Sequence, residues 1–143
     1  MFDPGLRGHQ AAREKLLERL QAGRLPGTLL FTGPEAVGKR RVALELAQRE
    51  LCFRKTACGT CEACRLFKGD DLPVELPNLL RIAPEGKAGL IKIGAVRDSD
   101  LLEGGVIRWA TLSPPPGCHR WILVEDAHRL NGAAANMLHK DLE

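Results

Sequence analysis

Residues 33–39, with the sequence GPEAVGK, constrain the fold more than any other segment, because they have the G-x-x-x-x-G-K spacing of a phosphate-binding loop. Such a loop surrounds a phosphate with backbone N–H groups and the N-terminus of the next helix. It therefore needs a strand before it and a helix after it. Residues 28–32 are an apolar run that predicts a short buried strand, and residues 40–51 repeat apolar side chains at helical spacing.

The rest of the chain continues this alternation of strands and helices. Helices are expected over residues 9–21 and 131–142, and a further crossover helix is expected to start within residues 91–97. Strands are expected over residues 78–82 and 120–126. Residues 68–77 are acidic and predicted to be exposed, and the three prolines within residues 113–117 exclude regular structure there. The pattern predicts an α/β fold, a parallel sheet with helices on both faces.

Length and charge exclude several classes of protein. A chain of 143 residues is one domain or a fragment of something larger, and 21 basic against 18 acidic residues give a net charge of only +3. That charge is too small to indicate a nucleic-acid-binding protein by itself. The start lacks a secretory signal and no apolar run approaches a membrane span of roughly 18 residues, so we expect a cytoplasmic protein without membrane contact and with reduced cysteines.

The phosphate loop is altered at its metal-binding position. Arg40 follows Lys39 where a magnesium-binding Ser or Thr normally stands, and Ala36 occupies a turn that would tolerate Gly better. Three interpretations remain: ATP hydrolysis, binding of ATP or ADP without hydrolysis, or a loop that only connects strand to helix. No catalytic residue is assigned. The candidate nucleotide-site residues are the loop and the two carboxylates after the last strand: Gly33, Pro34, Glu35, Ala36, Val37, Gly38, Lys39, Arg40, Glu125 and Asp126.

A cluster of four cysteines follows the helix expected over residues 40–51: Cys52, Cys58, Cys61 and Cys64. Thiolates at this spacing can converge tetrahedrally on zinc at about 2.3 Å. An iron–sulfur cluster is the rival interpretation, although its usual further Cys-Pro is missing, and four unliganded thiols are the third. A full set of four sulfurs leaves no open position, so the expected zinc is structural. Cys118 lies outside this spacing and is interpreted as an ordinary thiol.

Several segments together resemble a known family. They are residues 29–39, 78–85, 91–97, 122–131 and 133–143, combined with the cysteine cluster. In this order along the chain they resemble the AAA+-type family of delta-prime subunits of the bacterial DNA polymerase III clamp loader. The resemblance implies an AAA+-like domain over residues 1–143, incomplete at its C-terminal end, with a zinc module inserted at residues 52–68.

The same resemblance implies a subunit that is non-catalytic or binds nucleotide weakly. It would belong to a hetero-oligomeric ring with gamma/tau-type and delta-type subunits, which uses ATP to load the sliding clamp onto primed DNA. The chain ends before the family's Ser-Arg-Cys segment, so no arginine that acts on a neighbouring subunit's ATP is assigned.

Two rival functions stay open. One is an autonomous P-loop ATPase such as the motor subunit of the same loader. The other is a zinc module that binds nucleic acid through its few surrounding basic residues, Arg54, Lys55, Arg65 and Lys68.

Overall fold

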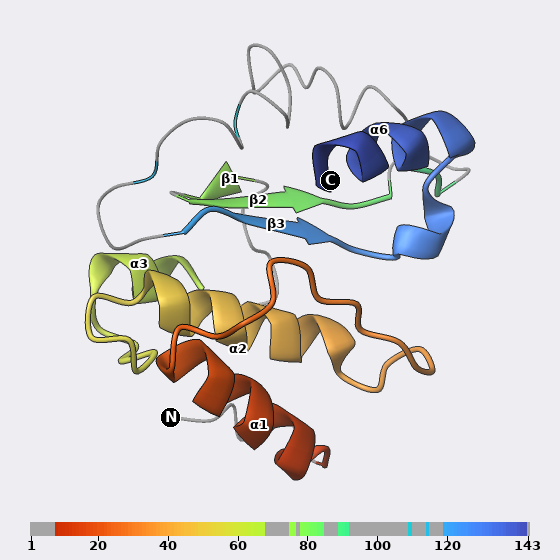
Figure 1. The fold of residues 1–143 in the computed structure, drawn as a ribbon. Coiled ribbons are helices and arrows are strands. Elements are labelled where there is room, and N and C mark those ends of the chain that lie inside the picture. Colours follow the sequence, from red (N-terminus) through yellow and green to blue (C-terminus); the bar gives the residue numbers. More distant parts are fainter. Residues whose placement is uncertain are drawn as a thin grey trace. The chain divides into compact units, whose positions relative to one another are not determined.

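The computed structural model describes residues 8–67, 75–76, 78–84, 89–91, 109, 114 and 119–142. The chain divides into two compact units, Met1–Leu72 and Pro73–Glu143, which we describe separately. In the first unit the described helices are α1 (Gln10–Gln21), α2 (Lys39–Leu51) and α3 (Glu62–Leu66) (Figure 1). The second unit contains the strands β1 (Glu75–Leu76), β2 (Leu79–Ile82) and β3 (Trp121–Val124), the short helix η1 (Ala127–Arg129) and α6 (Gly132–Leu142).

The two long helices of the first unit pack against each other. On α2, Ala43, Leu46 and Ala47 are buried, and their spacing of three and four residues puts them on one face of the helix. Leu17 is the buried apolar residue of α1. The helices expected over residues 9–21 and 40–51 are confirmed to within one residue at their first position.

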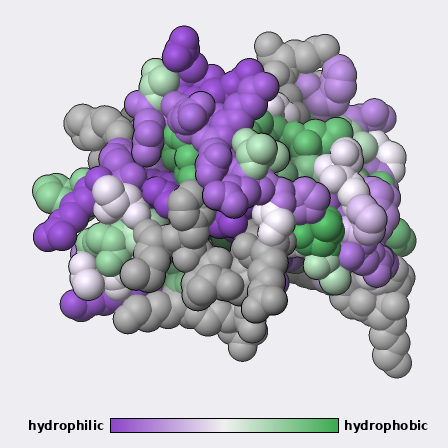
Figure 2. Space-filling view, turned by 90° about the horizontal axis from the view of Figure 1, so that it is seen from below, coloured by the Kyte–Doolittle hydropathy of each residue, from purple (hydrophilic) through white to green (hydrophobic). Residues whose placement is uncertain are grey.

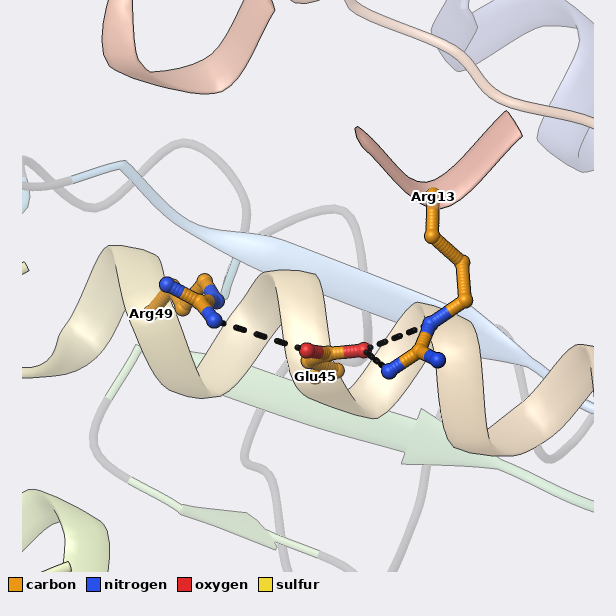
Figure 3. A network of polar contacts seen from close by, with 3 residues as sticks. All are labelled: Arg13, Glu45 and Arg49. Atoms are coloured by element: carbon orange, nitrogen blue, oxygen red, sulfur yellow. Dashed lines mark hydrogen bonds and ion pairs between the residues drawn. The ribbon is translucent and has the colours of Figure 1, made fainter. Parts of the chain in front are cut away.

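A charged network joins α1 to α2 (Figure 3). Arg13 of α1 donates to the Oε2 atom of Glu45 on α2 through Nε at 3.2 Å and through Nη2 at 2.8 Å. Arg49, one turn further along α2, places Nη2 3.6 Å from Oε1 of the same carboxylate. Arg13 and Glu45 are only 6% and 8% exposed, so this ion pair forms away from water.

The strand expected over residues 28–32 is wrong for this structure, because the segment has no regular secondary structure. Leu29 and Phe31 are half-buried and line a hollow against α1, whereas Leu30 is 79% exposed. The segment therefore keeps the alternation of a strand, but no described strand pairs with it. The sequence pattern shows that the side chains alternate between two faces. A segment becomes a strand only if it also forms hydrogen bonds with a neighbouring strand.

The sheet of the second unit has the order β1-β2-β3. β2 and β3 are parallel with Leu79 opposite Trp121 and Ile82 opposite Val124, which confirms the strand expected at 78–82 and the core of the one expected at 120–126. The expectation of a purely parallel sheet is wrong at β1, which pairs antiparallel with β2. Only two residues separate β1 from β2, and a connection this short permits only a hairpin.

The core of the second unit lies between the sheet and α6. Leu80 and Ile82 alternate on one face of β2 and pack with Ile91, Trp109 and Ala134, and partly buried Val124, Leu130 and Leu138 complete the cluster. Asn131 directly precedes α6 and caps it, because its side-chain Oδ1 accepts a hydrogen bond from the N–H of Ala134 at 2.8 Å. The final helix expected at residues 131–142 is thus confirmed, with Asn131 as its cap.

On the face drawn in Figure 2, hydrophilic side chains gather beside patches of hydrophobic ones. Glu14, Lys15, Glu18 and Arg19 of α1 are all exposed. Among the described residues no helix has the length and apolar composition needed to span a membrane. The expected helix start at 91–97 and the proline segment at 113–117 lie mostly outside the described residues, as do most of residues 68–77.

Candidate metal centre and phosphate loop

The four cysteines of the expected metal site come together where α2 ends and α3 begins. Cys52 is the cap that follows the last residue of α2, and Cys61 is the cap that precedes the first residue of α3. Cys58 lies in the connecting turn and Cys64 within α3. Their four Sγ atoms lie within 4.8 Å of one another. Cys52 and Cys64 are each 1% exposed, so half of the donor set is shielded from water.

The separation of the sulfurs fits a tetrahedral metal ion. Four thiolates at the zinc–sulfur distance of about 2.3 Å would lie about 3.8 Å apart. The Sγ atoms of Cys61 and Cys52 are 4.0 Å apart. An all-sulfur donor set of four is the set that zinc takes in structural sites. The residues therefore fit zinc, and a bound zinc ion would hold the end of α2, the turn and α3 together.

Backbone N–H groups point at two of the sulfurs. The N–H of Cys58 donates to Sγ of Cys52 at 3.5 Å, and the N–H of Cys64 donates to Sγ of Cys61 at 3.4 Å. The turn can aim these groups because Lys55, Ala57 and Gly59 have positive φ angles of 56°, 54° and 73°. Hydrogen bonds to sulfur stabilise the thiolate, which is the form that binds a metal.

The thiols differ in how readily they ionise. The hydroxyl of Thr60 donates to Cys58 and, with nearby backbone N–H groups, lowers the pKa of that thiol to about 5. Burial pushes the pKa of Cys52 upward, but N–H groups of the following turn, that of Cys58 first, outweigh it and lower the pKa to about 7. Burial raises the pKa of Cys64 to about 12. A metal ion would have to displace the proton of Cys64.

The phosphate loop begins after residues 28–32 and ends at Gly38, which has a φ of 98° and leads into α2. The side chain of Lys39 turns back over this loop. Its Nζ atom donates to the carbonyl oxygens of Gly33 at 2.8 Å and of Pro34 at 2.6 Å. The ammonium group that would neutralise a phosphate is therefore hydrogen-bonded to the loop itself. Arg40, the residue in place of the magnesium-binding hydroxyl, is exposed at the start of α2.

Ala36 lies at the strained position of the loop. Its φ is 58°, in the left-handed region that glycine adopts freely and alanine adopts only at a cost. The neighbouring positive angles in the loop belong to glycines, with Gly33 at 138° and Gly38 at 98°. The loop thus follows a path suited to glycine at three positions and has alanine at one of them.

The two carboxylates expected at the strand end belong to the second unit and follow β3 directly. Oε1 of Glu125 lies 2.6 Å from Nε of Arg81 on the neighbouring strand β2, and both side chains are largely buried. Asp126 is exposed and has a φ of 49°. An arginine this close neutralises Glu125, which makes that carboxylate a poor magnesium ligand.

The structure thus brings together the four cysteines within the first unit, and the phosphate loop lies in the same unit. Two residues that contact the candidate site residues were not predicted from the sequence. Arg81 neutralises Glu125, and its only signal was a charged residue between the core residues Leu80 and Ile82 of a strand. Thr60 donates to Cys58, and a hydroxyl residue between two of the candidate ligand cysteines was a signal that the sequence did contain.

The chain is similar to a described family and to several known proteins. The family model described as DNA polymerase III, delta subunit, matches residues 8–143. DNA polymerase III subunit delta' of Pseudomonas aeruginosa is 36% identical over 117 residues, which cover 80% of this chain and 32% of that protein. DNA polymerase III subunit tau of Salmonella typhimurium is 28% identical over 139 residues, 95% of this chain and 20% of that protein.

Subunit tau of Escherichia coli matches over 139 residues with the same identity, 28%, and there the chain covers 19% of the relative. The chain thus spans 19–32% of the length of these relatives. The family model covers nearly all of the sequence, and the delta' relative exceeds 30% identity over most of it. This chain therefore belongs to the family described as DNA polymerase III, delta subunit.

Proposed function

We propose that this chain is the N-terminal, AAA+-like part of a clamp-loader subunit of the bacterial replicative polymerase. It would act in the cytoplasm within a hetero-oligomeric ring that contains tau-type and delta-type subunits. That ring would use ATP to place a sliding clamp on primed DNA. Membership of the family supports this assignment, as does the similarity to proteins named delta' and tau.

Within the ring we propose a role in assembly without ATP hydrolysis. The observation that carries this proposal is the pairing of Glu125 with Arg81 at 2.6 Å, combined with Arg40 next to Lys39. Phosphoryl transfer depends on a magnesium ion held by a loop hydroxyl and a strand-end carboxylate. Here Arg40 stands at the position of the loop hydroxyl, and Arg81 neutralises the strand-end carboxylate of Glu125. Under this proposal the nucleotide-binding features are degenerate in each unit separately, at loop residues 33–40 in the first and at the strand-end carboxylates Glu125 and Asp126 in the second.

We propose further that residues 52–68 form a module stabilised by one zinc ion inserted into the nucleotide-fold domain. Cys52, Cys58, Cys61 and Cys64 would hold the ion, because their sulfurs lie within 4.8 Å of one another. Zinc bound by four thiolates has no open position for water and supplies folding energy, not catalysis. The module would fix the end of α2 and the turn that follows it.

The test uses the full-length subunit with tau-type and delta-type subunits of the same organism. We expect the proteins to co-elute as one complex in size-exclusion chromatography and the isolated subunit to hydrolyse no ATP. In the assembled ring, Lys39→Ala in this subunit should leave the rate of clamp loading within about twofold, since loss of a non-catalytic lysine removes no transition-state contact.

A control variant of this subunit, Arg41→Ala, checks that a change at the same helix end does not disturb assembly. ATP hydrolysis by the isolated subunit that disappears in Lys39→Ala would contradict the proposed role and favour an autonomous ATPase.

A further inference from the structure

Lys55 lies between the first two candidate metal ligands, Cys52 and Cys58, and its backbone is strained. Its φ of 56° falls in the left-handed region, which a residue with a Cβ atom adopts only at a cost. Glycine adopts this conformation freely, and lysine does not. A strained residue of this kind persists only where the surrounding contacts hold it, so the contacts of Lys55 show what the strained turn supports.

The side chain of Lys55 folds back onto the end of α2. Its Nζ atom donates to the carbonyl oxygen of Glu50 and lies 3.5 Å from Oε1 of the same residue. The side chain of Glu50 is only 9% exposed, so one end of this contact is held inside the protein. Glu50 belongs to the last turn of α2, where carbonyl groups lack partners within the helix. Lys55 therefore caps the helix and ties it to the turn that follows.

The main chain of Lys55 fixes the same turn a second time. Its N–H group donates to the carbonyl oxygen of Cys52 at 2.9 Å, which closes a four-residue turn over residues 52–55. Beyond this turn the chain comes back to the helix end, where the N–H of Cys58 donates to Sγ of Cys52 at 3.5 Å. The path between these two cysteines thus depends on how Lys55 is held.

Contacts that hold this path should raise the affinity of the cysteine cluster for a metal ion. Five residues separate Cys52 from Cys58, and ordering them when the metal binds would cost conformational entropy. Contacts that order the segment in advance reduce that cost. Residues that orient metal ligands without touching the metal commonly change metal affinity about 10- to 100-fold. Lys55 makes contacts of this kind through both its main chain and its side chain.

We propose that Lys55 is a positioning residue for the metal site. By bonding to the carbonyl groups of Glu50 and Cys52, it holds the turn in the path that brings Cys58 back to Cys52. This inference rests on the proposed function, because it assumes that the four cysteines bind zinc. The effect comes from these hydrogen bonds and not from the charge of Lys55, since its ammonium group is paired with the Glu50 carboxylate.

The test measures the Kd for zinc of the full-length subunit by competition with a chromogenic chelator. Lys55→Ala should raise Kd about 10-fold, the lower end of the range for residues that orient a ligand. Alanine disfavours the left-handed conformation as lysine does, so this variant removes only the side-chain contacts. Lys55→Arg, which keeps a cationic donor, should restore most of the affinity. Glu50→Gln keeps the carbonyl acceptor and should raise Kd less than Lys55→Ala.

Two control variants separate positioning from charge and from general stability. Arg54→Ala removes an exposed cation from the adjacent residue of the same turn and should leave Kd unchanged. Arg13→Gln breaks the buried ion pair with Glu45 and should change Kd far less than Lys55→Ala does. Cobalt(II) in place of zinc supplies a spectroscopic readout. Saturated Lys55→Ala should keep the visible absorption of a tetrahedral thiolate site, because all four ligands remain and only the affinity falls.

The outcomes separate this inference from the proposed function. If the wild-type subunit binds zinc and Lys55→Ala binds it equally tightly, the positioning role is refuted while the zinc module stands. If the wild-type subunit binds no zinc, both fail. An equal rise of Kd in Arg54→Ala would show that charge sets the affinity, and an equal rise in Arg13→Gln would show that general stability does. Either result, or a failure of Lys55→Arg to restore affinity, would overturn the inference.

Discussion

The buried carboxylate of Glu45 offers a sharp test of how the first unit is held together. Replacing it by the isosteric Gln removes the negative charge between Arg13 and Arg49 with almost no change of shape. Arg13 is 6% exposed and Glu45 8%, so the Arg13 guanidinium group would lose the Glu45 carboxylate in a poorly solvated position. Removal of one partner from a buried ion pair typically costs about 3–5 kcal/mol. We take the lower end, about 3 kcal/mol, because neutral Gln still accepts a hydrogen bond.

The geometry also predicts an order among three variants. Arg13→Gln leaves Glu45 with Arg49 at 3.6 Å, so that loss should be smaller, about 2 kcal/mol. Arg49 is 12% exposed at its side chain and its contact exceeds hydrogen-bond distance, so Arg49→Gln should cost about 1 kcal/mol or less. The double variant Arg13→Met with Glu45→Leu should recover most of the stability, since apolar replacements remove both desolvation penalties together.

The assay is urea unfolding followed by far-UV circular dichroism, which reports the helices. Tryptophan fluorescence would report the second unit instead, because Trp109 and Trp121 both lie there. A loss of about 3 kcal/mol should also lower the melting temperature by roughly 10 °C for a chain of this size. The reasoning is refuted if Glu45→Gln costs less than about 1 kcal/mol, or if Arg49→Gln destabilises more than Arg13→Gln.

Three further predictions concern the loop and the cysteines. Elemental analysis should find about one zinc per chain, and Cys61→Ser should lower the melting temperature in the metal-loaded protein far more than Cys118→Ser; equal effects would argue against the assigned ligands. The protons released on zinc binding, measured by calorimetry in buffers of different ionisation enthalpy, should decrease from about pH 6 to about pH 8, because Cys52 with its pKa lowered to about 7 loses its proton over that range. Release should still exceed zero at the upper end, because burial raises the pKa of Cys64 to about 12 and its proton must still leave; a pH-independent count would contradict the pKa directions. Ala36→Gly should stabilise the protein by up to about 1 kcal/mol in thermal unfolding, since the φ of 58° favours glycine in the folded state and the greater freedom of glycine in the unfolded chain offsets part of that gain; a clear loss of stability would show that the loop does not follow this path.

Structural features that depend only on residues close together in the sequence were predictable. The helices α1 and α2 follow from apolar spacing within a few turns, and the convergence of Cys52, Cys58, Cys61 and Cys64 follows from their close spacing. In each case the residues that contact one another are neighbours along the chain, so local geometry decides the outcome.

Features that depend on distant partners were not predictable. Residues 28–32 have the composition of a strand, yet pairing depends on another segment and is not encoded in the run itself. The pairing of Arg81 with Glu125 joins a residue of β2 to the residue that follows β3, and the register of these two strands is fixed only by the folded sheet. The antiparallel direction of β1 follows from its connection to β2, because two residues between strands allow only a hairpin. The strand itself was not predicted, because residues 68–77 are acidic and contain prolines.

The helix α2 begins at Lys39, which contacts the phosphate loop, and ends against Cys52, which belongs to the cysteine cluster. Thirteen residues at 1.5 Å each make it a rod of about 20 Å between the two. Inserting one residue would rotate one end against the other by about 100°, so that either the lysine or the cysteine would point away from its neighbours. Insertions and deletions in this rod should therefore be tolerated only in multiples close to whole helical turns. A change in its length would then act on both ends of the rod at once.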